Sequence, residues 1–378
     1  MAEHPRVLFV STSIGAGHNQ AAAAIQAALR QSCPRIESEF VDALEVARWW
    51  FRLYYSKGDM ILLTRLPWLY EYGYRLTNKP SGLRRAPSER MRLWLERRGL
   101  RPFHDWLLQR RPALIVATHY LVTPLIGRLI EQGVDGLRMV SVCTDNDAHR
   151  WWYAEHTEHY FVANERVPAE LAPWGVPAER ITVSGIPIHP KWTMPLDRQR
   201  ILAEWKLPVD KPIVILSGGT FFTLGPIERV ARGILDTTDA HVVVLASWNK
   251  QLLADLAKFP EAGTRLTPVP FTDKAHELAE VAAIMVTKAG GLTTAECIAK
   301  GLGIVLTKSL PGQERSNSEL LSRAGAALLA PEADDVVRTV ARLLSNPVEL
   351  AKLRANGRRL YRPGTDVIVA RLREMLGV

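Results

Sequence analysis

The chain has 378 residues, of which 47% are hydrophobic and 23% are charged. These fractions are typical of a globular protein and exclude a disordered or fibrous chain, and the length suits about two or three domains. No apolar run approaches the roughly 20 residues that cross a bilayer, and Met1–Val10 enters a strand-like run without signal-peptide features. Cys33, Cys143 and Cys297 form no CxxC pair, which argues against a zinc or redox site and favours the cytoplasm.

The formal net charge of +9 is concentrated in one part of the chain. The segment from Arg48 to Arg111 holds 15 Lys and Arg residues against 5 Asp and Glu, a local charge of +10. The rest of the chain is therefore close to neutral. Such a basic segment indicates an acidic partner, either a nucleic acid or an anionic membrane surface.

In the first half of the chain, predicted strands alternate with room for helices. Arg6–Ser11 is a short apolar run that ends near glycines, which is typical of a buried parallel strand. An alanine-rich helix is expected from about His18 to Leu29. Further strands are predicted at Ala113–Ala117, Met139–Cys143, His159–Val162 and Ile181–Ser184. The spacing leaves room for helical crossovers, so a doubly wound sheet is expected.

The Pro-rich stretch Gly185–Pro208 interrupts this alternation, after which it restarts. The second set of predicted strands is Pro212–Ser217, His241–Ala246, Leu266–Val269, Ala283–Val286, Ile304–Leu306 and Ala326–Leu329. Asp334–Leu376 is expected to be helical, and the last helix can pack back on the first domain. We therefore predict an α/β fold of two Rossmann-like domains, 1–185 and 209–378, joined by a linker at 186–208.

The first motif with chemical content lies directly after the first predicted strand. Gly15 and Gly17 allow a tight turn and the close approach of a ligand, and the following helix offers backbone N–H groups. Gln20 stands where the dinucleotide fingerprint requires a third glycine, so that fingerprint is excluded. His18, with Asn19 beside it, either faces the crevice at the strand ends or caps the helix.

The second half carries two glycine turns after strands. Ser217–Thr220 can surround a phosphate with N–H groups or be a plain turn. The run Thr287–Cys297 predicts a strand, a Gly-Gly turn and a helix, with Glu296 placed either to grip ribose hydroxyls or only to favour the helix dipole. Polar residues after the next strand are placed to read sugar hydroxyls. The candidate nucleotide-sugar ligands are Gly218, Gly219, Thr220, Lys288, Gly290, Gly291, Leu292, Thr293, Glu296, Gln313, Glu314 and Asn317.

A DxD triplet, Asp145-Asn146-Asp147, follows one of the first-half strands. In one class of sugar transferases such a triplet holds a divalent metal that bridges the nucleotide diphosphate. Here nothing else in the sequence supplies matching ligands. We therefore predict no metal site and keep Asp145 as a candidate catalytic residue in the crevice.

The basic segment interleaves arginines with aromatic residues. A nucleic acid suits it through base stacking. An anionic lipid surface suits it equally, because Trp and Tyr favour the headgroup level and each basic residue contributes about 1 kcal/mol. The structural alternative is a solvated basic helix over buried aromatics. One side of a helix and loop is expected to carry Arg84, Arg85, Arg90, Arg92, Arg97 and Arg98. The candidate membrane-binding residues are Trp49, Trp50, Arg52, Trp68, Arg84, Arg85, Arg90 and Trp94.

Together these motifs resemble the glycolipid synthases of glycosyltransferase family 28, which include monogalactosyldiacylglycerol synthases and processive diacylglycerol glucosyltransferases. The likeness to the transferase that makes lipid II is more distant. The resemblance rests on SxGxGHxxAA at Ser13–Ala22, Thr144-Asp145 with His149 and Trp152, Gly185-Ile186-Pro187, TKAGGLTTAE at Thr287–Glu296 and PGQExxN at Pro311–Asn317. Phe221 and Phe222 depart from the small residues common after the second-half glycine pair, and Asn146 and Arg150 depart from the run around Thr144-Asp145.

The resemblance implies two Rossmann-like domains that face each other across a cleft (GT-B), with no cofactor and no metal requirement. It assigns the acceptor and the membrane to the N-terminal domain and the nucleotide-sugar to the C-terminal domain. By matching positions it implies six roles: His18 as general base, Asp145 near the reaction centre, Gly15, Gly17 and Asn19 in the acceptor-side loop, Gly290 and Gly291 at the diphosphate, Glu296 at the ribose, and Gln313, Glu314 and Asn317 at the donor sugar.

The implied function is an inverting transfer of a hexose from a UDP-sugar to a membrane lipid hydroxyl, on diacylglycerol or glycosyldiacylglycerol. Uridine rests on the resemblance alone. We expect a peripheral protein on the cytoplasmic face of the plasma membrane, with no nucleic-acid partner, and a His18 pKa near about 6.5. Three alternatives remain: a polyprenyl-linked acceptor, a nucleotide-sugar 2-epimerase, and a non-enzymatic basic module that binds membrane or nucleic acid.

Overall fold

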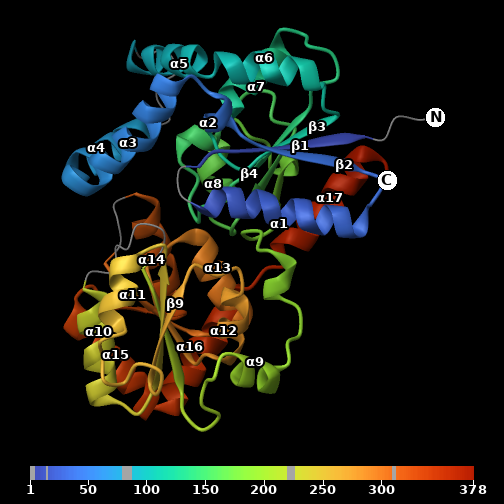
Figure 1. Ribbon diagram of the computed structural model, residues 1–378. Helices are drawn as coiled ribbons and strands as arrows, with labels where there is room; N and C mark the ends of the chain where they lie inside the picture. Colours follow the sequence, from blue (N-terminus) through green and yellow to red (C-terminus); the bar gives the residue numbers. More distant parts are fainter. Residues whose placement is uncertain (1–4, 14–15, 79–86, 219–225, 309–311) are drawn as a thin grey trace. The chain divides into compact units, whose positions relative to one another are not determined.

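A computed structural model describes most of the chain, namely residues 5–13, 16–78, 87–218, 226–308 and 312–378. It divides into two compact units. The first consists of residues 1–190, 310–313 and 362–378, and the second of residues 191–309 and 314–361. The C-terminal segment 362–378 thus belongs to the first unit, although it follows the second unit in the sequence (Figure 1).

The first unit contains a fully parallel sheet of six strands in the order β2-β1-β3-β4-β5-β6. Its strands are β1 (Arg6–Ser11), β2 (Glu37–Asp42), β3 (Leu114–Ala117), β4 (Met139–Val142), β5 (His159–Val162) and β6 (Ile181–Val183). The fold class predicted from the sequence is confirmed for this unit. The edge strand β2 was not predicted, because its sequence ESEFVD is polar and only its last two residues are buried.

Helices cover both faces of the first sheet, and the side chains of β1 alternate between them. Val7 and Phe9 join a core with α1 (Ala16–Ser32) and α17 (Gly364–Leu376). Leu8 and Val10 join the core of the opposite face, which includes residues of α6 and α7. In Figure 1 the C-terminal α17 lies beside α1. Burial on both faces explains why the strand reads as a continuous apolar run.

The remaining helices of this unit fill the long connection between β2 and β3 and the crossovers beyond it. They are α2 (Ala43–Val46), α3 (Trp49–Arg65), α4 (Pro67–Thr77), α5 (Pro87–Gly99), α6 (Arg101–Arg110), α7 (Thr123–Glu131) and α8 (Val167–Leu171), with 3-10 turns at Arg150–Trp152, Ala172–Trp174 and Ala178–Arg180. In the part of the chain that the structure describes, we find no helix with both the length and the apolarity needed to cross a bilayer.

The second unit contains a second parallel sheet, in the order β12-β11-β10-β7-β8-β9. Its strands are β7 (Ile213–Ser217), β8 (His241–Ser247), β9 (Leu266–Pro270), β10 (Ile284–Thr287), β11 (Gly303–Leu306) and β12 (Ala327–Leu329). Its helices are α9 (Arg198–Glu204), α10 (Ile227–Thr237), α11 (Lys250–Leu256), α12 (Ala275–Val281), α13 (Gly291–Lys300), α14 (Gln313–Arg323), α15 (Ala333–Ser345) and α16 (Pro347–Leu360), after a 3-10 turn at Pro190–Trp192.

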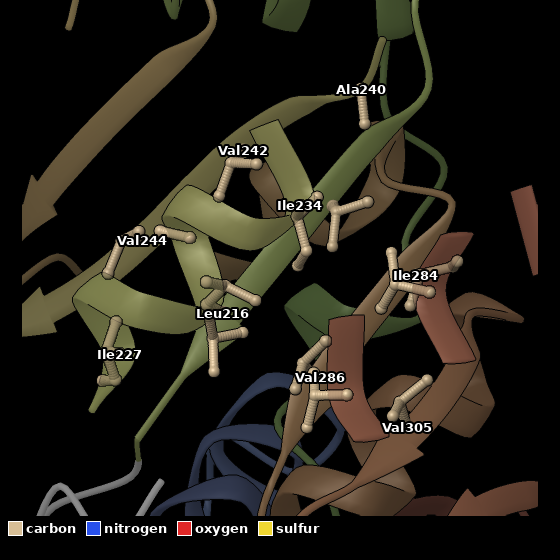
Figure 2. Packing of buried hydrophobic residues seen from close by; sticks show 14 of the residues in the cluster. Leu216, Ile227, Ile234, Ala240, Val242, Val244, Ile284, Val286 and Val305 are labelled. Atoms are coloured by element: carbon tan, nitrogen blue, oxygen red, sulfur yellow. The ribbon is translucent and has the colours of Figure 1, made fainter. Parts of the chain in front are cut away.

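The core of the second unit follows from helical and strand periodicity together. Helix α10 buries residues 227, 230, 231, 234 and 235, the spacing of one helix face. This face packs on β7, β8 and β10, and Figure 2 shows Ile227 and Ile234 beside Val242, Val244 and Leu216. An apolar layer therefore packs against the second sheet, and the polar residues lie at the ends of its strands.

In each sheet the strand order reverses once, between β1 and β3 and between β7 and β10. At such a reversal the crossover helices leave toward opposite faces, so a crevice opens at the carboxyl ends of the two strands. The paired residues Ser217 and Thr287 end β7 and β10 at the second reversal. Both reversals fall where the sequence places its glycine turns.

The junction of α3 and α5 gives a direct test of the packing. A Cβ atom added to Gly99 would lie 2.2 Å from Cγ of the buried Phe51. We expect Gly99→Ala to lower the free energy of unfolding by about 1–3 kcal/mol, because a rigid ring must move. Gly73→Ala is the matched control, since nothing lies within 4 Å of its added Cβ. Urea denaturation measures both, and equal stability of the two variants would contradict the packing.

Candidate active site

In the first unit, His18 lies at the reversal point of the sheet, in the first turn of α1. Its Nδ1 is 3.1 Å from the carbonyl oxygen of Thr118 and 2.7 Å from Oγ1 of Thr144. Thr118 follows β3 and Thr144 follows β4, so three strand ends converge on one imidazole. The Thr118 hydroxyl donates in return to the His18 carbonyl oxygen, at 3.1 Å.

These contacts determine which nitrogen of His18 carries the proton. A carbonyl oxygen only accepts hydrogen bonds, so the contact with Thr118 favours a proton on Nδ1 of the neutral ring, and the Thr144 hydroxyl can then act as a second acceptor. The lone pair of the ring is then at Nε2. A neutral imidazole in this tautomer can accept a proton from a substrate hydroxyl through Nε2.

The environment of His18 shifts its titration strongly. Burial lowers the pKa of His18 to about 4, with the hydrogen bond to Thr118 acting in the opposite direction. His119 lies edge-on with ring centroids 4.6 Å apart, and burial followed by the charge of His18 lowers the pKa of His119 well below its usual range. The expectation of an ordinary His18 pKa was therefore wrong, because tertiary neighbours remove the ring from water.

Asp145 lies beside the same ring system, on the loop after β4. Its Oδ2 accepts a hydrogen bond from Nε1 of the buried Trp152 at 3.1 Å, and the Trp152 ring centroid is 6.4 Å from that of His18. Gln313 is the first residue of α14. Burial and then the nearby Asp147 raise the pKa of Asp145 to about 8.

The neighbouring residues of the acceptor-side loop have structural partners. Asn19 Nδ2 donates to Asp42 Oδ2 at 3.4 Å, and Gly17 lies in the first turn of α1. Gly15 lies outside the described residues. His149 donates through Nε2 to the Tyr74 carbonyl oxygen at 3.0 Å, which ties α4 to the loop that carries Trp152.

The two carboxylates of the DxD triplet accept hydrogen bonds from other side chains of the first unit. Asp147 Oδ2 accepts a hydrogen bond from the Tyr74 hydroxyl at 3.2 Å, and Asp145 contacts Trp152. Over the described ranges of the chain, no three His, Cys, Asp or Glu side chains are grouped to hold a metal ion. Whether transfer needs a metal stays a prediction for experiment.

In the second unit, the turn after β10 presents a helix N-terminus. Gly290 is the N-cap of α13 and has no side chain with which to cap the first turn. Asn317, which is 1% exposed, donates through Nδ2 to the Ala289 carbonyl oxygen at 2.8 Å and so fixes the turn. The backbone N–H groups of Gly291, Leu292 and Thr293 form the first turn, the position where a helix binds an anion.

The other predicted donor ligands also lie near this turn. Lys288 Nζ is 2.5 Å from Glu314 Oε1, so both side chains pair with each other. Glu296 lies on the second turn of α13, and burial raises its pKa to about 8 against the opposing charge of Lys191. Gly218 is buried directly after β7, whereas Gly219, Thr220, Phe221 and Phe222 lie outside the described residues.

One part of the second unit was missed from the sequence. A cavity of about 170 Å³ opens at the carboxyl ends of β7, β8 and β9, lined by Ser217, Leu245, Ser247, Pro270, Phe271, Thr272 and Ala275. Trp248 and Phe271 stack beside it, with ring centroids 4.4 Å apart and an interplanar angle of 12°. Both rings are largely exposed, at 75% and 55%. The sequence signal that could have revealed this cavity is an aromatic residue directly after each of two neighbouring strands, Trp248 after β8 and Phe271 after β9.

The predicted membrane-binding residues divide between surface and core. Trp49, Trp68 and Trp94 are 73%, 68% and 47% exposed on α3, α4 and α5. Trp50 instead packs against the core, because it lies on the inner side of α3. We define the aromatic–basic surface as Trp49, Arg52, Leu53, Tyr54, Trp68, Tyr72, Arg90, Met91 and Trp94, all of them exposed. Arg84 and Arg85 lie outside the described residues.

Comparison with known proteins covers both units. Residues 18–188 match the family model described as monogalactosyldiacylglycerol (MGDG) synthase, and residues 231–359 match the glycosyltransferase family 28 C-terminal domain. A processive diacylglycerol beta-glucosyltransferase of Bacillus mycoides is 25% identical over 369 residues, 96% of this chain and 92% of the relative. The Bacillus thuringiensis enzyme of the same name is 24% identical over 371 residues, with the same coverage.

Solved structures share the fold at lower identity. MurG of Acinetobacter baumannii superposes with a TM-score of 0.62 at 16% identity, over 98% of this chain and 99% of that one. A UDP-GlcNAc 2-epimerase of Neisseria meningitidis, bound to UDP-GlcNAc, has a TM-score of 0.61 at 14% identity, over 98% and 100%. These likenesses establish the fold.

Two Rossmann-like units with strand-end sites of this kind define the chain as a glycosyltransferase of the GT-B class. The two halves match the models of monogalactosyldiacylglycerol synthase and of the glycosyltransferase family 28 C-terminal domain, and the chain is a hexosyltransferase.

The depressed pKa of His18 makes stability depend on pH. Because the folded-state pKa of about 4 lies below the ordinary 6.5, the unfolded chain binds more protons between these values. The contribution of the neutral His18 side chain to the free energy of unfolding is complete above pH 6.5. It is lost as pH falls through about 4, and the loss amounts to up to about 3 kcal/mol. We expect His18→Gln to flatten this part of the pH profile of unfolding free energy. Identical wild-type and variant profiles would contradict the enclosed ring.

Proposed function

We propose that the chain transfers a hexose from a UDP-sugar to the hydroxyl of diacylglycerol or glycosyldiacylglycerol in a membrane, with inversion at the anomeric carbon. The observation that carries this proposal is the contact of His18 Nδ1 with the Thr118 carbonyl oxygen at the reversal point of the first sheet, which favours a lone pair at Nε2. The names of the most similar curated relatives support a diacylglycerol acceptor and a hexosyl donor. The 2-epimerase alternative gains only a shared fold from its structural likeness.

In this mechanism His18 acts on the acceptor. The acceptor oxygen attacks the anomeric carbon while its proton passes to Nε2, and the bond to the nucleotide oxygen breaks with its electron pair. The Thr118 carbonyl oxygen, 3.1 Å from Nδ1, stabilises the imidazolium that forms. A low pKa keeps the ring neutral at physiological pH, at the cost of basicity.

The donor fits the strand ends of the second unit. The diphosphate would accept hydrogen bonds from the first turn of α13, whose dipole also stabilises the charge that develops on the leaving group. Asn317 supports this by holding the Ala289 carbonyl oxygen, so it positions the turn. Glu296 would bind ribose hydroxyls, and the exposed stack of Trp248 and Phe271 offers a flat apolar face to the base.

The aromatic–basic surface would hold the enzyme where its acceptor is. Exposed Trp and Tyr side chains favour the headgroup level of a bilayer, and Arg52 and Arg90 add attraction to anionic lipid of about 1 kcal/mol each. We therefore place the enzyme at the cytoplasmic face of the plasma membrane as a peripheral protein. Nucleic acid is not proposed as a partner, because the proposed acceptor is a membrane lipid and the aromatic–basic surface lies in the unit that would bind it.

The direct test is incubation with labelled UDP-glucose or UDP-galactose and liposomes of diacylglycerol and an anionic lipid, in the presence of a chelator. Lipid-soluble label is expected with one of the two sugars, and less of it when the anionic lipid is replaced by a neutral one. Conversion of the free nucleotide-sugar without lipid would establish the epimerase instead. A product formed only with polyprenyl-linked acceptors would change the acceptor class, and a requirement for divalent metal would overturn the metal-free mechanism.

Two variants are expected to separate acceptor chemistry from donor binding. His18→Gln keeps a donor toward Thr118 but has no base, so kcat should fall by about 10²–10⁴-fold with UDP affinity unchanged. Glu296→Ala should weaken UDP binding by about tenfold or more, because it removes the carboxyl group that would bind the ribose hydroxyls. Calorimetric titration with UDP and single-turnover assays measure the two effects. Full turnover by His18→Gln would remove His18 from the role of base.

A further inference from the structure

One cavity of the first unit lies apart from His18. It has a volume of about 330 Å³ and lies between α5, α7 and the loop at 150–156. Its walls include Leu93 and Glu96 from α5, Leu125 from α7, and Trp151 and Tyr153 from the loop. Neither His18, Thr118, Thr144 nor Asp145 lines it. A ligand in this cavity would therefore be separate from the reacting atoms, and the volume suits a small molecule.

The floor of the cavity is a compact and balanced ion cluster. Arg92 contacts Glu89 at 2.7 Å and Glu96 at 2.5 Å, and Arg150 contacts Glu89 at 3.1 Å. Glu89, Glu96 and Arg150 are each more than nine-tenths buried. Two cations thus face two carboxylates. Arg97, Arg128, Glu131 and Glu155 also line the cavity, so the whole lining holds four arginines and four glutamates, and with no excess of either charge a neutral ligand is favoured.

Two buried polar atoms of the lining lack partners. Among the residues that the structure describes, Glu96 Oε2 and Trp151 Nε1 make no hydrogen bond. The first is an acceptor when the carboxyl is ionised and the second is a donor, and leaving either atom unsatisfied is unfavourable. Both atoms are shielded from solvent, so a ligand reaches them after a side-chain rotation at the cavity wall. A hydroxyl group satisfies either atom, because it both donates and accepts.

We propose that this cavity binds a neutral polyhydroxylated headgroup, the hexosyl-glycerol end of a glycolipid, as a second site outside the reaction centre. The rings of Trp151 and Tyr153 supply the apolar wall against which a sugar ring can pack. Access from a membrane follows from α5 itself, whose Met91 and Trp94 are exposed while Leu93 and Glu96 line the cavity. The inference goes beyond the proposed function, since binding here requires no transfer.

A continuous set of ring contacts connects this cavity with the catalytic histidine. Trp151 contacts Tyr120 with centroids 5.3 Å apart, Tyr120 contacts His119 at 4.2 Å, and His119 contacts His18 at 4.6 Å. A headgroup that rotates or fixes Trp151 would therefore act on side chains that pack directly against the ring of His119. Occupancy of the second site is expected to change acceptor turnover as well as local protection.

The test uses glucosylglycerol, the soluble headgroup, with the full-length protein and hydrogen–deuterium exchange. Protection is expected over residues 87–100 and 150–156. Leu93→Trp fills the cavity and should abolish this protection, whereas the matched Leu108→Trp, at an exposed site of α6 outside the cavity, should behave as wild type. Trp151→Phe keeps a ring but removes the donor, so the concentration for half-maximal protection should rise about fivefold or more.

Several results would overturn the second site. These are protection that persists in Leu93→Trp, protection confined to residues 11–19, stronger protection by glycerol 3-phosphate than by glucosylglycerol, or no protection at all, which indicates a water-filled cavity. Transfer assays on the same preparations keep this separate from the proposed function. Turnover without protection would support the proposed transfer and contradict the second site. Protection without turnover would support the second site and contradict the proposed transfer.

Discussion

The reversal of strand order in each parallel sheet is the constraint on which the sites of this protein depend. Strands buried on both faces leave only their ends for polar chemistry, and the reversal is where two crossover helices diverge and leave backbone accessible. In the first unit this point places His18 against the ends of β3 and β4. In the second it places the start of α13 beside β7. The apolar layers around each sheet thus determine where proton transfer and anion binding can occur.

At both points a backbone carbonyl oxygen sets the geometry of the reactive group. The Thr118 carbonyl oxygen selects the tautomer of His18, and the Ala289 carbonyl oxygen is held by Asn317 so that the turn before α13 keeps its direction. Asn317 was predicted as a donor-sugar contact, and that prediction stays open. Its burial and its bond to Ala289 give it a positioning role, which shows how a polar residue near a site can act through the backbone without contacting substrate.

The sequence was informative where local pattern and burial coincide, as in RVLFVS of β1 and PIVILS around β7, and where glycines follow such strands. It did not reveal β2, whose exposed edge position removes the apolar pattern. The pKa of His18 could not be predicted, because Thr118 and His119 lie about a hundred residues away along the chain. Likewise only the fold distinguishes Trp49, which is exposed, from Trp50, which packs inward.

Helix α5 shows why a count of basic residues overstates the charge available to a membrane. Arg92 was predicted to share one surface with its neighbouring arginines, but its guanidinium is held by Glu89 and Glu96 at helical spacings of three and four residues. That ion cluster is neutral and faces inward, whereas Arg90, Met91 and Trp94 face outward on the same helix. One helix therefore serves two surfaces. Its outer face carries the charge and aromatic rings that we propose for contact with lipid, and its inner face closes the cavity that we propose for a neutral ligand.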